Sequence, residues 1–457
     1  LIQKLNADMF SGYMHDAKPL NGGTHNSDYN MQDGWNSAMW THMYSYIFPQ
    51  IYQSENATRD TEPALFGITK VLKVEVMHRV TDYYGPIIYK NFANARNQYR
   101  PDTQKEVYYE FFNELDSAVV SLVGYIEKRP ESNGFSRFDL LLDGQYSSWV
   151  KFANSLRLRL AMRISAVDPD KAYTEFRKGL ENEFGVFEAE DERVAVSTQS
   201  GFTNPLGELN RVWNETYMSA AMESILTGYD DPRLKVYFEA CTDKAYAGEY
   251  RGIRQGTCFA HNHYAGLSKL AVDQSTDAPL MNSAEIWFLR AEAALRGWTP
   301  EDEEECYLNG IKASLHQHGI YQMDDYLNSE RTAADFTDTY DAENNIPARC
   351  RVSPKWNPAD DKEVKLEKII TQKWIANWML GNEAWADYRR TGYPHLIPAT
   401  ATGNKSGGVV DSNRGVRRMP YPTEENTNNQ ENVQYARDNY LNGPDNMATD
   451  VWWACKK

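Results

Sequence analysis

Residues 282–319 read NSAEIWFLRAEAALRGWTPEDEEECYLNGIKASLHQHG, and this stretch decides the fold. Its first part, 282–297, carries apolar residues at helical spacing and ends in a glycine, where helices commonly stop. After a short turn, the acidic run 301–305 is typical of the first turn of another helix, because the helix dipole favours negative charge there. The stretch therefore predicts two helices joined by a tight turn.

The two predicted helices form a hairpin whose length is close to a tetratricopeptide repeat of about 34 residues. Small side chains on the first helix would let the second approach closely, namely Ala284, Ala291, Ala293 and Ala294. Apolar stripes at three- and four-residue steps predict further helices over 62–84, 105–127, 146–167 and 364–380. The predicted fold is mainly α, a tetratricopeptide-like helical-hairpin scaffold with an irregular, long-loop region that faces a ligand.

The aromatic stretch 373–394 continues the last of these helices. Trp374 and Trp378 lie on its apolar stripe, which predicts that they are buried against other helices. The pair Arg389 and Arg390 allows two interpretations, binding of an anionic ligand or neutralisation of buried carboxylates near a helix end. The second interpretation is favoured.

Helical and irregular segments alternate along the whole chain. The scaffold is predicted at about 62–184, 278–320 and 364–394. The segments 11–61, 185–277, 321–363 and 395–457 are rich in Gly, Asn, Asp, Pro, Thr and Tyr, and long loops of this kind are uncommon unless they carry function. No linker divides the chain, so one domain over 1–457 is predicted.

Composition limits the classes of partner. The formal net charge of −16 disfavours a nucleic acid, because affinity for phosphates depends on clustered Lys and Arg. The chain contains no run of 18 apolar residues, so a membrane-spanning helix is not predicted. Aromatic residues reach 13%, with 29 Tyr and 12 Trp, and many fall in the irregular segments. Exposed aromatic rings suit the flat apolar faces of sugars.

No motif points to catalysis, a metal or a cofactor. The chain lacks GxSxG, GxGxxG, P-loop and HExxH patterns, and its five cysteines show no CxxC spacing. Cys241 and Cys258 could form a disulfide or remain free thiols, and the sequence leaves both open. A binding protein that is not an enzyme is the better interpretation.

Four segments in order give the chain a family resemblance, and they cover nearly its whole length. The segments are AEIWFLRAEAALRG at 284–297, EKIITQKWIANWMLGNEAWADYRRTGYP at 367–394, RRMPYPTEENTNN at 417–429 and GPDNMATDVWWACKK at 443–457. With these segments the chain resembles the SusD/RagB family of outer-membrane nutrient-binding lipoproteins, in the starch-binding-like, outer-membrane-associated branch.

The resemblance implies a protein at the cell surface of the outer membrane that captures an oligo- or polysaccharide without cleaving it. Its partner would be a SusC-like TonB-dependent transporter. Its membrane contact would be only an N-terminal lipid anchor, on a cysteine upstream of Leu1. The alternatives are capture of oligopeptides by a member of the same family, and a glycoside hydrolase on a helical scaffold.

The resemblance also implies a sugar platform built from loop aromatics in two regions, assigned by region rather than by exact motif. Candidates in 25–40 are Tyr29, Trp35 and Trp40 as stacking rings, with Asp28 and Gln32 as hydroxyl partners. Candidates in 246–266 are Tyr250, Phe259 and Tyr264 as rings, with Arg254 and His263 as polar partners. Trp356, between prolines in a loop, is a further candidate ring.

Overall fold

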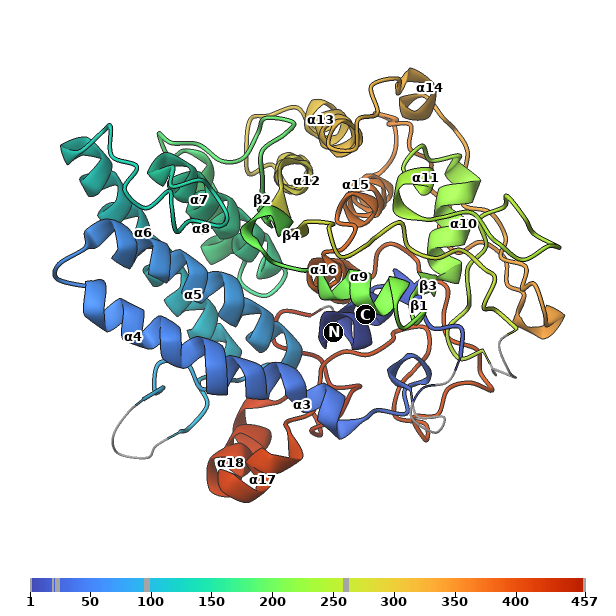
Figure 1. Cartoon of the computed structure of the whole chain (residues 1–457), viewed down its shortest axis with the longest axis horizontal. Helices are drawn as coiled ribbons and strands as arrows, with labels where there is room; N and C mark the ends of the chain where they lie inside the picture. Colours follow the sequence, from blue (N-terminus) through green and yellow to red (C-terminus); the bar gives the residue numbers. More distant parts are fainter. Residues whose placement is uncertain (1, 19, 21–24, 94–98, 258–262, 455–457) are drawn as a thin grey trace. The chain divides into compact units, whose positions relative to one another are not determined.

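The structure is a computed structural model and describes residues 2–18, 20, 25–93, 99–257 and 263–454 (Figure 1). Helices dominate these residues, and short strands pair into two small antiparallel sheets. The prediction of a mainly α fold is confirmed. Within the described ranges, no helix is both long enough and apolar enough to cross a membrane.

The contacts divide the chain into two compact units, Leu1–Gln32 with Glu188–Gly415, and Asp33–Phe187 with Val416–Lys457. The first unit holds, in chain order, α1 Ile2–Leu5, α2 Ala7–Phe10, β1 Met14–His15, η2 Asn26–Asp28, β2 Arg193–Val196, η4 Thr198–Ser200, α9 Pro205–Arg211, β3 Tyr217–Met218, α10 Ala220–Tyr229, α11 Leu234–Tyr237, β4 Ala278–Asn282, α12 Ser283–Leu295, α13 Glu303–His316, α14 Asp324–Leu327, η5 Ala342–Asn344, α15 Lys362–Ala376 and α16 Gly381–Thr391. The second unit holds α3 Asp33–His42, η3 Met43–Ile47, α4 Phe48–Thr58, α5 Pro63–Tyr84, α6 Gln104–Lys128, α7 Tyr146–Arg163, α8 Pro169–Leu180, α17 Thr423–Asn428 and α18 Gln430–Tyr440. A compact unit is not the same as an independently folding domain, so the single domain over 1–457 stays a prediction.

The predicted hairpin consists of α12 and α13, which pack side by side in the first unit (Figure 1). Asn282 and Asp302 cap the two helices, since each side chain accepts a first-turn backbone N–H, at 2.8 and 2.9 Å. Gly310 permits the close approach, because a Cβ there would lie 2.7 Å from the ring of Phe288. The hairpin prediction is confirmed, and a glycine rather than an alanine marks this tight contact.

The aromatic stretch forms α15 and α16, with a break earlier than the sequence suggests. α15 ends at Ala376, and Met379 then adopts left-handed backbone with a φ of 68° before α16 begins. Trp374 and Trp378 are buried in the core of the first unit, as predicted. The Nε1 atom of Trp374 donates to the carbonyl of Ser11 at 2.8 Å, which fixes the indole against the N-terminal segment.

The arginine pair on α16 is structural. Arg390 donates to both carboxylate oxygens of Glu292 on α12, each at 2.7 Å. Arg389 lies over the ring of Trp385, with 3.5 Å between the guanidinium carbon and the ring centroid. Arg390 thus neutralises a buried carboxylate, and Arg389 donates to the carbonyl of Trp385 at 3.3 Å, so a structural role fits this pair better than ligand binding.

In the second unit, α5 packs against α6, α6 against α7 and α7 against α8 (Figure 1). α5 and α6 match the predicted helices 62–84 and 105–127 to within one residue at each end. Thr103 and Glu106 form a reciprocal capping box at the start of α6. α7 stops at Arg163, four residues before the predicted end at 167.

All four segments predicted to be irregular contain helices. α3, η3 and α4 occupy much of 11–61, α9 to α11 lie in 185–277, the short α14 lies in 321–363, and α17 with α18 lie in 395–457. The sequence of these helices shows no clear apolar stripe from which they could be predicted, for two opposite reasons. α4 and α18 are mostly solvent-exposed, with two buried residues each, whereas α10 is buried on nearly every face.

The two small sheets tie loops to helices within the first unit. β2 pairs antiparallel with β4, with Val194 opposite Met281, and β4 runs directly into α12. β1 pairs antiparallel with β3, with Met14 opposite Met218. The loops of this unit therefore have fixed points on the helical scaffold.

Candidate functional site

The first predicted binding stretch, 25–40, crosses the boundary between the two units. Its first part belongs to the first unit, where the Tyr29 ring is 3% exposed and its backbone φ is 63°. Tyr29 therefore presents no stacking face, and this prediction is corrected. Asp28 and Gln32 are half-buried, and Asp28 Oδ1 accepts the backbone N–H of Asn30 at 3.1 Å.

The second part of this stretch forms α3 in the second unit. Trp40 is buried, with its ring centroid 4.7 Å from that of Tyr44 and 5.2 Å from that of Tyr84. Its indole Nε1 donates to Glu425 at 3.2 Å, so Trp40 is a core residue, not a stacking platform. Trp35 is half-buried near the start of α3, so a stacking role for it stays a prediction.

The second predicted stretch, 246–266, also places some candidates in structural roles. Arg254 is buried and donates to the carbonyls of Pro398 and Asn344 at 3.0 and 2.9 Å. Both partners are backbone groups of other loops. Arg254 therefore holds these loops together, and its donors to them are not available for a sugar hydroxyl. Tyr250 is half-buried against the core, and Phe259 lies outside the described residues.

Tyr264 is also buried, at 1% exposure, and its hydroxyl donates to the carboxylate of Asp338 at 3.1 and 3.2 Å. The prediction that Tyr264 is a stacking ring is therefore wrong. The prediction that Trp356 is a stacking ring is wrong for a similar reason. Trp356 packs in the core, with its ring centroid 4.9 Å from that of Tyr307. The sequence around Trp356 and Tyr264 suggests exposed rings, because the residues that bury them lie far away along the chain.

The contact of Tyr264 leads to a site that the sequence did not single out, the Tyr340 loop, residues 337–345. Phe336 and Ile346 pair antiparallel and close this loop at its base. Asp338 Oδ1 accepts the backbone N–H groups of Tyr340 and Asp341 at 2.8 and 2.9 Å. The carboxylate thus holds the turn from inside, in the manner of an Asx turn.

Tyr340 is the exposed ring of this loop, with 60% of the residue accessible to solvent. The imidazole of His263, a predicted site residue, meets it edge-on, with ring centroids 3.6 Å apart and planes inclined by 69°. His263 is itself half-buried. An exposed aromatic face with a polar ring at its edge and carboxylate and amide groups around it can stack on a sugar and hydrogen-bond its hydroxyls.

The loop is anchored to the scaffold by polar contacts. Arg251 donates to Thr337 Oγ1 at 3.1 Å, and the hydroxyl of Tyr246 donates to the carbonyl of Thr339 at 3.0 Å. Arg251 in turn lies 3.0 Å from Glu223 of α10, whose other carboxylate oxygen accepts the backbone N–H of Gly252 at 2.6 Å. Burial raises the pKa of Glu223 to about 7, although the guanidinium of Arg251 opposes the shift.

A signal for Tyr340 exists in the sequence. The stretch TDTYDAENN at 337–345 has a tyrosine between two aspartates, a pattern typical of a turn built by Asp side chains. The segment 321–363 is predicted to face the ligand, with Trp356 as its candidate ring. Tyr340, in a polar turn of the same segment, is the exposed ring, whereas Trp356 is buried.

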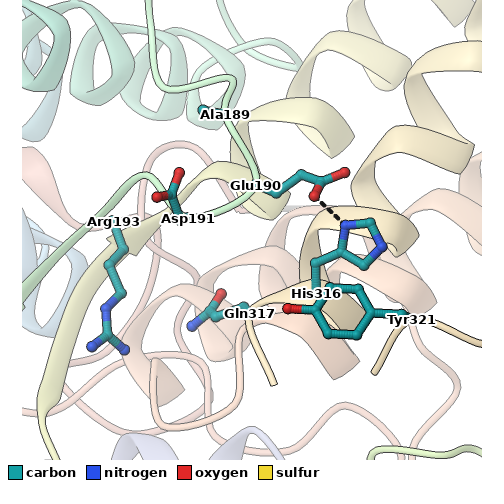
Figure 2. Close-up of a pocket in the computed structure, with 7 residues that line it drawn as sticks. All are labelled: Ala189, Glu190, Asp191, Arg193, His316, Gln317 and Tyr321. Carbon is teal, nitrogen blue, oxygen red and sulfur yellow. Dashed lines mark ion pairs between the residues drawn. The ribbon is translucent and has the colours of Figure 1, made fainter. Parts of the chain in front are cut away.

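A second place with an exposed ring is a hollow of about 640 Å³, lined by Ala189, Glu190, Asp191, Arg193, His316, Gln317 and Tyr321 (Figure 2). Glu190 pairs with the imidazole of His316 across it, as Figure 2 shows. The Tyr321 ring lies 5.0 Å from that imidazole. Arg193 is already paired with Asp277 at 2.8 Å. None of these residues was predicted as a site residue.

The described residues also bear on metals and thiols. They contain no group of three or more His, Cys, Asp or Glu side chains that could hold a metal ion. Cys241, Cys306 and Cys350 are buried free thiols. Cys258 and Cys455 lie outside the described residues.

Comparisons with known proteins identify the family of this chain. The family model described as SusD-like, "Susd and RagB outer membrane lipoprotein", matches residues 1–454. This chain belongs to the SusD-like family. The family is one of outer-membrane lipoproteins, so the resemblance read from the four segments is confirmed.

Solved structures agree with this assignment. The SusD-like chain is similar to a chitin-binding SusD homolog from Flavobacterium johnsoniae, at 40% identity and a TM-score of 0.95, covering 100% of this chain and 94% of that one. It is also similar to a SusD homolog from Bacteroides vulgatus, at 39% identity and a TM-score of 0.93, covering 100% and 92%. The comparison with curated proteins finds no match. The family model and these structures therefore agree on a SusD-like outer-membrane lipoprotein.

Proposed function

We propose that this SusD-like protein captures an oligo- or polysaccharide at the cell surface through the Tyr340 loop and does not cleave it. It then passes the glycan to a SusC-like TonB-dependent transporter, and an N-terminal lipid anchor holds it at the outer membrane. The observation that carries the binding role is the exposed Tyr340 ring, held by Asp338 and flanked by His263.

Stacking is the main source of affinity in this proposal. Sugar hydroxyls already bond well to water, so each hydrogen bond to protein adds only about 0.5–1.5 kcal/mol. The apolar face of a sugar gains more by covering an aromatic ring. Asp341 and Glu343 are exposed in the same loop, which places acceptors for hydroxyls beside the ring.

Oligomers of N-acetylglucosamine are the first ligands to test, because one relative at 40% identity is described as chitin-binding. The experiment is a glycan-array and affinity-gel screen of the purified protein, with an assay for newly released reducing ends on each hit. Binding without released ends supports the proposal. Cleavage would replace it by a hydrolase, and binding of peptides with silence on every glycan would replace it by oligopeptide capture.

Two tyrosine variants locate the binding face. Tyr340→Ala is expected to weaken binding of the glycan at least tenfold. Tyr173→Ala on α8, a residue 38% exposed on the scaffold, is the matched control and should bind like the native protein. Equal binding by Tyr340→Ala and the native protein would place the site elsewhere.

The hand-over to a transporter has its own test. The full-length lipoprotein, isolated in mild detergent from its native outer membrane, should copurify with a TonB-dependent barrel. Isolation as a single protein under these conditions would contradict the partnership and leave the glycan role intact.

A further inference from the structure

A pocket of about 410 Å³ lies directly after the Tyr340 loop in the chain, lined by Ala348, Arg349, Arg351, Glu367 and His395. Its two arginines share one side of an extended segment. Along 349–352 exposure alternates, with Arg349 and Arg351 exposed and Cys350 and Val352 buried. Alternation with a period of two places both guanidinium groups on the same, outward face.

These arginines differ from the buried arginines of the same unit. Arg390 is paired with Glu292, and Arg233 is paired with Asp231 at 2.7 Å. For Arg349 and Arg351 the described residues supply no carboxylate partner. In a chain with a net charge of −16, two neighbouring guanidinium groups that form no ion pair among the described residues make this place locally electropositive.

The neighbouring groups respond to this positive charge. Partial burial lowers the pKa of His395, and the charge of Arg349 lowers it further. Burial also lowers the pKa of Arg254, and Arg349 again adds to the effect. Burial is the main cause of both shifts, and the positive charge of Arg349 acts in the same direction in each.

Glu367 is the carboxyl group of the lining, and it opposes an anion only in part. Its carboxylate accepts the backbone N–H of Arg351, and burial raises its pKa, which favours the uncharged form. Its Oε1 atom is buried and has no hydrogen-bond partner among the described residues. The carboxyl group therefore has an acceptor to offer to a hydroxyl of a ligand.

The pocket lining begins at Ala348, three residues after the Tyr340 loop ends, and Arg254 lies near both. The side chain of Arg254 donates to the carbonyl of Asn344, within that loop. The same guanidinium feels the charges of both Asp338, inside the loop, and Arg349, in the pocket. Arg254 therefore links the Tyr340 loop to the positive charge of the pocket.

We propose that this pocket binds the carboxylate or sulfate group of an acidic sugar, with Arg349 and Arg351 donating to its oxygens and Glu367 accepting from a neighbouring hydroxyl. The inference rests on the proposed function, since it names the chemical class of the glycan captured at the Tyr340 loop. Guanidinium groups suit this role because their planar donors match carboxylate and sulfate oxygens.

The test compares acidic oligosaccharides with neutral counterparts of the same length and linkage. A panel of uronic-acid and sulfated oligosaccharides is paired with the carboxyl-reduced or desulfated forms, and each affinity is measured by titration calorimetry. The native protein is expected to bind at least one acidic member at least tenfold more tightly than its neutral counterpart. Inorganic sulfate should compete with the acidic member but not with the neutral one.

Variants assign the preference to the pocket. The double variant Arg349→Gln and Arg351→Gln should lose the preference for the acidic form while keeping its affinity for the neutral form. Arg331→Gln, an exposed arginine that pairs with Asp230 at 2.9 Å, is the matched control and should keep the preference.

Failure of this inference is distinguishable from failure of the proposed function. Equal affinity for acidic and neutral members would overturn the acidic subsite and leave glycan capture in place. Competition by sulfate without a preference among sugars would show a site for a free inorganic anion and would also overturn it. No binding of any glycan would overturn the proposed function itself.

Discussion

Acidic side chains find different partners in two regions, the charged core between α12 and α16 and the Tyr340 loop. In the core, Arg390 pairs with Glu292 and Asp387 pairs with Lys373 at 2.8 Å, so each charge is met by a charge from elsewhere in the fold. In the loop, Asp338 is satisfied mainly by N–H groups of its own turn. The difference teaches that a turn that stabilises itself can leave a ring such as Tyr340 free for a ligand.

The carboxyl groups of the two regions carry the same contrast. Burial alone would raise the pKa of Glu292, but the guanidinium groups of Arg390 and Arg296 outweigh it and lower the pKa to about 2. For Glu223, beneath the Tyr340 loop, burial outweighs its one arginine and raises the pKa to about 7. A buried carboxyl group with strong arginine partners favours its charged form, and one with weaker partners favours its neutral form.

The largest expected effect is on the core. Trp374→Ala should lower the free energy of unfolding by about 3–5 kcal/mol, because it removes a buried indole and leaves a cavity. Denaturant unfolding measures it, and Trp213→Ala, an exposed tryptophan, is the control with little expected change. Glycan affinity, measured where the variant is still folded, should match the native protein. A stable variant that has lost its ligand would reverse the roles assigned to core and loop.

An intermediate effect concerns the acid side of the charged core. Glu292 contributes stability above its unfolded pKa near 4.5, and this contribution is lost as the pH falls toward about 2. At about 1.4 kcal/mol per pH unit, the loss approaches roughly 3 kcal/mol. Glu292→Gln should therefore be less stable than the native protein at pH 7 and lose less stability on acidification. Urea unfolding at several pH values checks this, with the exposed Glu305→Gln as control. Parallel pH profiles for the native protein and Glu292→Gln would contradict the assignment.

An effect of opposite sign and similar size is expected at Glu223, whose partner Arg251 contacts the Tyr340 loop. The folded pKa of Glu223 lies above its ordinary value, so its contribution is present at low pH and is lost as the pH rises from about 4.5 to about 7. Glu223→Gln should gain stability relative to the native protein across this window. The measurement is the difference in the free energy of unfolding at pH 5 and pH 8. A difference that does not change with pH would show that Glu223 titrates normally.

The sequence predicted the scaffold well because its signals are local. The stripe through Trp374 and Trp378 and the hairpin over 282–319 can be recognised from neighbours three or four residues apart. The burial of both tryptophans follows from that spacing.

The candidate site could be predicted by region but not by residue. Trp40, Tyr264 and Trp356 are buried by partners that lie far away in sequence, such as Glu425 for Trp40 and Asp338 for Tyr264. Aromatic residues in polar segments look exposed until those partners are known. His263, predicted as a polar partner for a glycan, lies at the edge of an exposed ring, Tyr340, which belongs to another loop, and its binding role stays a prediction.

The measurement that tests the division between scaffold and loop most directly is hydrogen–deuterium exchange of the native protein with and without its best glycan. We expect the ligand to slow exchange in 337–345 and in 246–266 and to leave α12 and α16 unchanged. Slower exchange confined to other segments, such as 189–193 and 316–321 around the hollow of Figure 2, would contradict binding at the Tyr340 loop.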